Sequence, residues 1–394
     1  MRPRIVFLNQ TLGQTFRQLA IDLANGVGPG VLYAGSEDAQ QIGNLTIRQG
    51  PRYRSERIGS RLWTWGLYLL WVTFACLFTP GKPLLFVVSN PPFTPLVAWL
   101  LKRLRGWRYV CLVWDVYPEV LVRFGYLKEQ SRIAKLWRAT NRLALQNADA
   151  VITIGDRMAH TLQQGLGNPQ TSIHVIPCWA DADAIRPLPK SENAFAQQHN
   201  QVEKFTILYS GKMGATHDLD TLLHVARRWR DRDDIGFLLI GGGAKYREIE
   251  RSVAEENLTN VILLPWQPEA LLPSSLPTGD VAIVSLDRGV EGISMPSRTY
   301  FMMAAGCALV GLSHGENDLR DTLEAYQCGL SVEPGDVDGL EAALQHFYES
   351  PSFLASCRQN ARAAAETVFS HPNIVAQYLQ LLTPLMSNRG EQDG

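Results

Sequence analysis

The chain has 394 residues and a hydrophobic share of 46%, which is enough for two or three domains that each bury a core. Lys and Arg number 37 against 38 Asp and Glu, so the overall charge points to no nucleic-acid partner. Six cysteines lie far apart without the spacing of a zinc site, and we expect reduced, mostly buried thiols. The N-terminus enters a strand-like run without the apolar core of a secretory signal, which favours a cytoplasmic location.

Short apolar runs alternate with helical stretches along the whole chain. They lie at residues 5–9, 84–90, 109–115 and 150–155 in the first half, and at 205–211, 236–243, 260–266 and 281–286 in the second. This alternation predicts two α/β domains with parallel sheets, over 1–183 and 204–370. The polar, Pro-containing stretch 184–203 is expected to be the linker, although it could be a long loop inside one domain. A C-terminal helix and a polar tail are expected over 371–394.

One segment departs from the pattern of a soluble domain. Residues 62–78 contain three Trp and no charged residue, and cations precede them at Arg52, Arg54, Arg57 and Arg61. A bilayer crossing needs about 20 apolar residues, so an interfacial or buried helix is favoured. Residues 96–109 repeat the combination of Trp and cations, with Lys102, Arg103, Arg105 and Arg108. We expect both segments to contact a membrane surface, the alternatives being a core helix and a solvated helix end.

In the first half, three polar loops follow strands and would line one crevice. Gly13 lies after the first strand, Asn90 after the run at 84–90, and Asp115 at the end of the run at 109–115. A partly desolvated carboxylate at Asp115 could act as a base or orient a hydroxyl group. It could equally cap the turn that follows.

In the second half, the segment SGKMGATHDLDTLL (210–223) ends a strand with Gly211 and Lys212, and Gly214 then allows a tight turn. Lys212 is placed to meet a phosphate group. His217 is either structural or a donor to a diphosphate. Gly242 ends the next strand, and loops after neighbouring parallel strands converge at one crevice.

The segment VEGISMPSRTYFMMAAG (290–306) follows the strand at 281–286 and is the most informative one. Its loop offers backbone N–H groups at the start of a helix, where the helix dipole favours a phosphate group. Phosphate would repel Glu291, so sugar hydroxyl groups are its natural partners. An ordinary turn with a solvated Glu is the alternative.

Metal binding is not predicted. The Asp pairs 181/183, 218/220 and 231/233 are not placed cleanly at strand ends, and the chain has no P-loop, GxSxG or HExxH motif.

These segments, together with LLIGGGAKYREIE, LLPWQPEALLPSSLPTGDVAIVSL, WDVYPE, ADAVITIGDRM and VIPCWAD, resemble family 4 glycosyltransferases, especially bacterial members that build surface polysaccharides. The resemblance covers nearly the whole chain. It implies a GT-B fold of two facing Rossmann-like domains with an interdomain cleft, the first for the acceptor and the second for a nucleotide-sugar donor. It also implies retention of configuration and no need of a metal.

The resemblance further places Lys212 near the donor diphosphate and Glu291 at the first acid of the Glu-x7-Glu motif. His217 takes a position often held by a second Lys. Phe301 or Thr299 stands where the second Glu is expected. In VIPCWAD, Cys178 stands where the family has the sequence PNW or PNG. The expected donor-binding residues are Gly211, Lys212, Gly214, His217, Gly242, Trp266, Gly292, Ser294, Pro296, Ser297 and Arg298.

We therefore expect a retaining hexosyltransferase that uses a nucleoside diphosphate-sugar and a lipid-linked or glycolipid acceptor at the inner face of a membrane. Glu291 and Asp115 would be catalytic, Gly13 and Asn90 would bind the acceptor, and no cofactor, metal or nucleic acid would take part. The alternatives are a nucleotide-sugar epimerase and a weakly active or inactive membrane-associated partner, which the missing second Glu favours.

Overall fold

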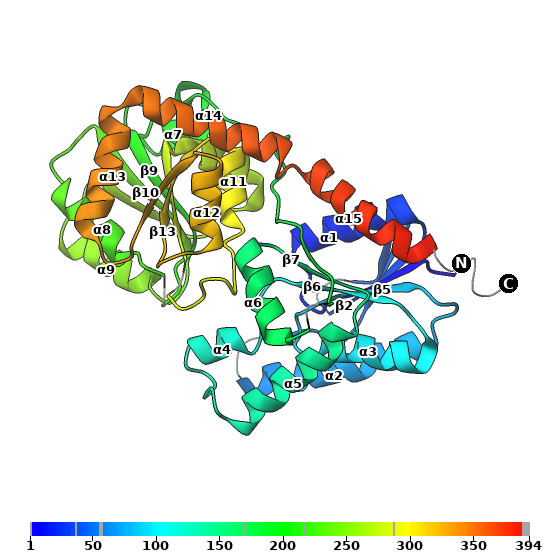
Figure 1. The fold of residues 1–394 in the computed structure, drawn as a ribbon. Coiled ribbons are helices and arrows are strands. Elements are labelled where there is room, and N and C mark those ends of the chain that lie inside the picture. Colours follow the sequence, from blue (N-terminus) through cyan, green and yellow to red (C-terminus); the bar gives the residue numbers. More distant parts are fainter. Residues whose placement is uncertain are drawn as a thin grey trace. The chain divides into compact units, whose positions relative to one another are not determined.

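The computed structural model describes residues 2–35, 38–54, 58–168, 170–215, 217–286 and 288–387 (Figure 1). The chain forms two compact units. The first comprises Met1–Pro177, Gly292–Ser294 and Val375–Gly394, and the second comprises Cys178–Glu291 and Met295–Ile374. The predicted α/β fold class is confirmed, because each unit is a sheet of mostly or entirely parallel strands covered by helices.

The first unit contains an eight-stranded sheet of order β3-β4-β2-β1-β5-β6-β7-β8, in which only β3 runs antiparallel. Its strands are β1 (Ile5–Leu8), β2 (Gly30–Ala34), β3 (Gln40–Ile42), β4 (Leu45–Gln49), β5 (Leu84–Val88), β6 (Tyr109–Val113), β7 (Ala150–Thr153) and β8 (Ile173–Val175). Strands β1, β5, β6 and β7 are buried along their whole length. Such uninterrupted apolar runs are typical of parallel strands that helices cover on both faces.

Helices cover both faces of this sheet. Figure 1 shows α2, α3 and α5 on one face and α1 with the later part of α15 on the other. The helices are α1 (Gln14–Val27), α2 (Ile58–Leu77), α3 (Thr94–Arg105), α4 (Glu119–Arg123), α5 (Arg132–Gln146), α6 (Asp156–Leu166) and α15 (His371–Ser387). The predicted C-terminal helix is thus present, while the tail from residue 388 lies outside the described residues.

The second unit contains a six-stranded parallel sheet of order β11-β10-β9-β12-β13-β14. Its strands are β9 (Phe205–Lys212), β10 (Ile235–Gly242), β11 (Val261–Leu264), β12 (Val281–Ser285), β13 (Ala308–Leu312) and β14 (Gly329–Val332). Its helices are η1 (Lys190–Glu192), α7 (Ala194–Gln198), α8 (Asp220–Arg228), α9 (Tyr246–Glu255), η2 (Glu269–Leu271), α10 (Leu272–Ser275), η3 (Leu276–Thr278), α11 (Arg298–Ala304), α12 (Asp318–Ala325), α13 (Val337–Glu349) and α14 (Pro351–Thr367).

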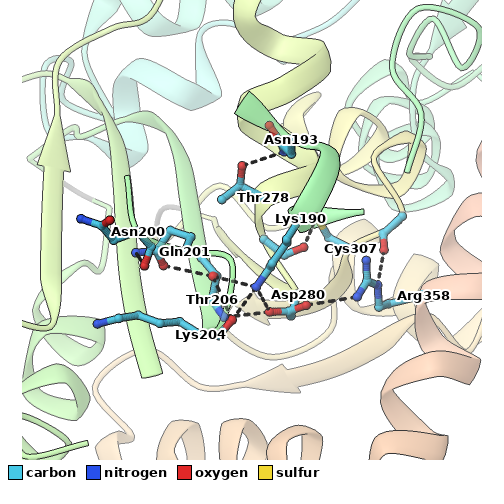
Figure 2. A network of polar contacts seen from close by, with 12 residues as sticks. Lys190, Asn193, Asn200, Gln201, Lys204, Thr206, Thr278, Asp280, Cys307 and Arg358 are labelled. Atoms are coloured by element: carbon cyan, nitrogen blue, oxygen red, sulfur yellow. Dashed lines mark hydrogen bonds and ion pairs between the residues drawn. The ribbon is translucent and has the colours of Figure 1, made fainter. Parts of the chain in front are cut away.

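The stretch 184–203, expected as a linker, is an integral part of the second unit. Lys190 pairs with Asp280 and also donates to the carbonyl oxygen of Lys204 at 2.6 Å. Arg358 approaches the other oxygen of Asp280 at 3.1 Å, so that one carboxylate is held between two cations (Figure 2). Asn193 donates to the carbonyl oxygen of Ser274 at 2.8 Å. The structure differs from the expectation because these anchoring partners lie far along the chain, where local composition gives no sign of them.

Candidate functional site

The ends of β9 and β10 lie side by side in the second unit. Gly211 pairs with Gly241 and Lys212 with Gly242. A Cβ atom at Gly241, which has a φ of +151°, would lie 1.8 Å from the carbonyl oxygen of Gly211. Only glycine therefore permits this close approach of the two strands. Lys212 is exposed at the end of β9, and its ammonium group has no hydrogen-bond or ion-pair partner among the described residues.

Gly214 and His217 lie together in the loop that leads to α8. The N–H of His217 donates to the carbonyl oxygen of Gly214 at 3.2 Å. A Cβ atom at Gly214 would be 2.8 Å from Nδ1 of His217, so glycine makes room for the imidazole ring. Asp218 accepts from the N–H of Thr221, in the first turn of α8, at 3.1 Å. The carboxylate of Asp218 therefore has a structural role at the start of α8.

Arg298 and Trp266 bring together loops that the sequence assigned to the donor. The guanidinium carbon of Arg298 lies 5.4 Å from the ring centroid of the half-exposed Trp266, which is a cation–π arrangement. The indole Nε1 lies next to Gly242, where a Cβ atom would be 2.9 Å away. Arg298 also points its NH1 group at the hydroxyl of Ser210, 3.5 Å away. Burial lowers the pKa of Arg298, but a guanidinium group remains charged at physiological pH.

Ser210 is a residue that the sequence reasoning missed. Its only local signal is its position directly before Gly211 at the end of a strand. The contact with Arg298 spans 88 positions of the chain, and spacing alone does not reveal it.

Glu291 lies in a turn and is half-buried. Its Oε1 atom accepts from the N–H of Gly289 at 3.0 Å. The second carboxylate oxygen has no hydrogen-bond partner within the described part of the chain, so it can accept a bond from a ligand hydroxyl. The turn continues through Gly292, whose φ of +67° favours glycine.

Pro296 and Ser297 start the helix α11 through their carbonyl oxygens. Pro296 accepts from the N–H of Thr299 at 3.1 Å, and Ser297 accepts from the N–H of Tyr300 at 3.3 Å. Thr299 is buried, and its hydroxyl donates to Pro296 at 2.8 Å. Of the two positions at which the second Glu of the motif is expected, Thr299 is thus a buried, hydrogen-bonded residue, and Phe301 lies two residues later on α11.

In the first unit, Asp115 lies just beyond the end of β6. Ser294 donates its hydroxyl to Oδ1 of Asp115 at 3.0 Å. Burial raises the pKa of Asp115, and the hydrogen bond from Ser294 opposes that rise. A carboxylate in this state is a better proton acceptor than an ordinary surface Asp.

Gly13 and Asn90 lie in two further loops of the first unit. Gly13 is the residue before α1 and is exposed. Asn90 donates from Nδ2 to the hydroxyl of Thr11 at 2.8 Å, which ties the loop after β5 to the loop after β1. The structure thus brings together two of the three loops that the sequence assigned to the acceptor.

Among the described residues, no group of three or more His, Cys, Asp or Glu side chains could hold a metal ion. Asp218 and Asp183, each a member of an Asp pair, are engaged with Thr221 and Arg186 respectively.

A large apolar surface covers the outward sides of α2, α3 and α5. On α2, Thr64, Tyr68, Val72 and Cys76 are buried at helical spacing, while the opposite side is exposed and equally apolar. Helix α3 packs against both α2 and α5, so the three outward sides adjoin. We call this surface the apolar face; it consists of Leu62, Trp63, Leu67, Leu70, Phe74, Phe78, Leu100, Leu104, Ile133, Leu136 and Leu143.

The cations near the apolar face divide into two groups. Lys102 donates to Asp149 at 3.0 Å, Arg105 donates to the carbonyl oxygen of Thr79 at 3.0 Å, and Arg108 donates to Leu385 at 3.0 Å. These three side chains are hydrogen-bonded to other residues of the first unit. They are therefore less available for lipid headgroups than the sequence suggested. Arg103, Arg132 and Lys135 are exposed and have no ion-pair or hydrogen-bond partner in the described ranges. Arg57 lies outside the described residues.

No helix within the described ranges is long and apolar enough to cross a bilayer.

The two α/β units, with Gly-rich loops at the ends of β9 and β10 and Arg298 at the start of α11, match the GT-B fold of solved glycosyltransferases. The family models agree: residues 13–179 match the glycosyl transferase 4-like domain, and residues 190–364 match the glycosyl transferases group 1 domain. The chain belongs to this family, the family 4 glycosyltransferases, and the resemblance seen in the sequence is confirmed.

Similar proteins are known from several bacteria. A probable glycosyltransferase of Pseudomonas aeruginosa, WbjE, is 24% identical over 76% of this chain and 74% of its own length. A putative colanic acid biosynthesis glycosyl transferase of Escherichia coli K12, WcaI, is 26% identical over 71% of this chain and 69% of its own. The structure of Anabaena HepE in complex with UDP and glucose has a TM-score of 0.73 at 15% identity, covering 96% of this chain and 99% of that chain.

Proposed function

We propose that the chain transfers a sugar from a nucleoside diphosphate-sugar to a lipid-linked or glycolipid acceptor at the cytoplasmic face of a membrane, in the synthesis of a polysaccharide. The observation that carries this proposal is the apolar face. The similarity to WcaI, a putative colanic acid biosynthesis glycosyl transferase, supports a role in polysaccharide synthesis.

The apolar face suits a lipid surface in its exposed apolar side chains and in its charge. Exposed contiguous apolar patches of this kind mark interaction sites, since water is a poor solvent for them. Trp63 is 69% exposed and Phe78 is 84% exposed, although both are among the most costly side chains to leave in water. The sequences of α2, α3 and α5 contain no Asp or Glu. Arg103, Arg132 and Lys135 would attract anionic headgroups, while Trp and Leu side chains would enter the interface.

The donor would bind at the ends of β9 and β10. Negative charge grows on the diphosphate as the bond to the sugar breaks, and Lys212 and Arg298 would stabilise it without a metal. The UDP and glucose bound to the similar structure HepE support a nucleotide-sugar donor. The second oxygen of Glu291 would accept a hydrogen bond from a sugar hydroxyl.

The acceptor would lose one proton as its oxygen bonds to the anomeric carbon of the donor. The bond between that carbon and the diphosphate oxygen breaks, and the nucleoside diphosphate leaves with the bonding electrons. Retention of configuration is expected if the leaving phosphate takes the acceptor proton on the same face of the sugar. Asp115, with its raised pKa, would orient the acceptor hydroxyl. No cofactor enters this scheme.

The proposal is tested by nucleoside diphosphate release from a panel of nucleotide-sugars, with and without a membrane extract, in the presence of a chelator. We expect release that depends on the extract and survives chelation. Release that is equally fast without the extract would contradict a membrane acceptor. Conversion of the nucleotide-sugar by itself would indicate an epimerase, and silence with every donor would indicate an inactive partner.

A further inference from the structure

A concave site lies in the first unit between α4, α5 and α6. Its volume is about 650 Å³, which falls within the range typical of small-molecule sites. None of the site residues predicted from the sequence lines it. The pocket therefore has no assigned role in donor binding or in the acceptor loops described above.

Three arginines line this pocket. Arg138 on α5 is held by Glu119, with Nε 3.1 Å from one carboxylate oxygen and NH2 3.0 Å from the other. Arg142 follows one helical turn later and donates Nε to the carbonyl oxygen of Gly165 at 3.2 Å. Its two terminal amino groups, and the whole guanidinium group of Arg123, have no partner among the described residues. The site thus presents unused donors in the fork geometry that matches phosphate oxygens.

The balance of charge in the pocket favours an anion. Glu119 and Glu129 also line it, so three guanidinium groups stand against two carboxylates. The charge of Glu119 is already matched by Arg138, and Glu129 is exposed at the rim. Val122, Leu145 and Leu166 form apolar parts of the wall. Arg123 and Arg142 are both exposed, so a phosphate group can reach the two guanidinium groups from solvent.

The pocket also adjoins the residue expected to orient the acceptor. It shares Val116, Tyr117 and Asn141 with a small cavity that Asp115 lines. Asn141 donates to the carbonyl oxygen of Tyr117 at 2.6 Å, which fixes the wall between the two spaces. Helix α5 carries Arg138 and Arg142 of the pocket and also Ile133, Leu136 and Leu143 of the apolar face, while Arg123 is the last residue of α4.

We propose that this pocket, hereafter the arginine pocket, binds the phosphate or diphosphate group of the acceptor. The inference rests on the proposed transferase function and names its acceptor as an anionic, phosphorylated lipid. The phosphate would lie against Arg123 and Arg142, the sugar to be extended would lie toward Asp115, and the lipid chain would follow the apolar face.

The first test is calorimetric titration of the full chain with inorganic pyrophosphate. We expect the double variant Arg123→Gln/Arg142→Gln to bind at least roughly tenfold more weakly, because it loses charge-assisted hydrogen bonds. Arg48→Gln is the matched control, since Arg48 is an exposed cation on β4, far along the sheet from α5. No binding by the unaltered protein, or equal weakening in both variants, would overturn the proposal. Arg138 is left intact because its pair with Glu119 supports the local structure.

A second test separates a lipid diphosphate from general membrane charge. Vesicles of phosphatidylcholine that contain a long-chain prenyl diphosphate are compared with vesicles of equal charge that contain phosphatidylglycerol. We expect the double variant to lose affinity for the first vesicles and to keep it for the second. Equal loss on both would mean that the arginines act only as surface charge, and the proposal would fall.

These results are distinguishable from a failure of the transferase function, because neither assay needs turnover. If pyrophosphate binding is lost in the double variant while acceptor-dependent transfer is unchanged, the pocket is not the acceptor site. If pyrophosphate and prenyl diphosphate bind through the arginines but no donor is turned over, the pocket assignment holds and the proposed function fails.

Discussion

The helices that cover the two sheets present opposite kinds of surface. In the second unit, Arg228 on α8 pairs with Asp338 and Glu341 of α13, and the indole N–H of Trp229 donates to Glu341 at 2.8 Å. In the first unit, α2 presents Leu70 and Phe74 outward, both about 60% exposed, with no charged residue between them.

This difference shows that the fold alone does not explain the apolar outer side of α2. A helix that covers a sheet needs one apolar side, and its outer side is normally polar, as α8 and α13 show. The inner stripe of α2 satisfies that need, so its apolar outer stripe has no packing role in the unit. A surface retained against the preference of water requires a partner, and the absence of acidic residues from α2, α3 and α5 favours an anionic lipid surface.

The largest effect is expected at Glu291, since it belongs to the proposed donor site at the strand ends of the second unit. Glu291→Gln should reduce kcat by roughly 100-fold to 1,000-fold, a size typical for the loss of one stabilising group at the transition state. Nucleotide affinity should change little, because Glu291 is expected to contact the sugar. Steady-state kinetics and calorimetry with the nucleoside diphosphate measure the two quantities. Glu248→Gln, an exposed position on α9, is the control, and equal losses in turnover and binding would contradict the assigned role.

The sequence was sufficient for features that depend on neighbours in the chain. The long buried strands and the glycines at the ends of β9 and β10 were predictable, because apolar runs and turn residues are local signals. The short strand β3 has three residues with exposed or half-buried side chains, so it leaves almost no pattern. The stacking of Arg298 on Trp266 and the anchoring of Lys190 by Asp280 depend on tertiary contacts between distant segments. Composition identified the apolar character of α2, but only the packing shows which side remains exposed.

A second variant tests the buried charges of the second unit. Lys190→Met should destabilise this unit by about 3 kcal/mol, because it leaves Asp280 buried with one cation instead of two. Hydrogen exchange of the amides in β9 and β12, compared with those in β1 and β5, measures the effect in each unit. Lys82→Met, at an exposed position of the first unit, is the control. Equal protection of β9 in the variant and the unaltered protein would show that the ion network adds nothing to stability.

A third variant removes the feature that separates the two helical surfaces. Leu70→Ser/Phe74→Ser should weaken partition into vesicles with anionic lipid by roughly 30-fold to 800-fold, since each of the two apolar side chains contributes about 1–2 kcal/mol on burial. Vesicle sedimentation measures the partition. The free energy of unfolding should not fall, because both side chains are exposed in the unit.

The matched control for this variant is Leu271→Ser, which removes an exposed Leu from the second unit. If both variants lose the same affinity for the vesicles, the apolar face is not the membrane contact. The difference between the helical surfaces of the two units would then not reflect membrane binding.

The smallest effect on stability and activity is expected at Asp115. Its burial suits the proposed role toward the acceptor but lowers the stability of the folded chain at neutral pH. Burial raises the pKa of this carboxyl in the folded chain above its ordinary value of 3.8. Below the ordinary value the group is protonated in both the folded and the unfolded state. As the pH rises through the folded pKa, ionisation favours the unfolded chain, so the contribution of Asp115 to stability declines. Asp115→Asn should therefore gain stability relative to the unaltered protein as the pH rises from acid to neutral, while transfer activity falls.

Urea unfolding at several pH values measures this difference, with Asp231→Asn, an exposed position of the second unit, as the control. A difference that stays constant with pH would show that the carboxyl of Asp115 is not perturbed. A gain in stability with full activity would show that Asp115 is buried but takes no part in positioning the acceptor. The proposed role needs both results, a pH-dependent gain in stability and a loss of transfer. Together they would show that the first unit keeps the carboxylate of Asp115 buried, at the expense of stability, because it positions the acceptor.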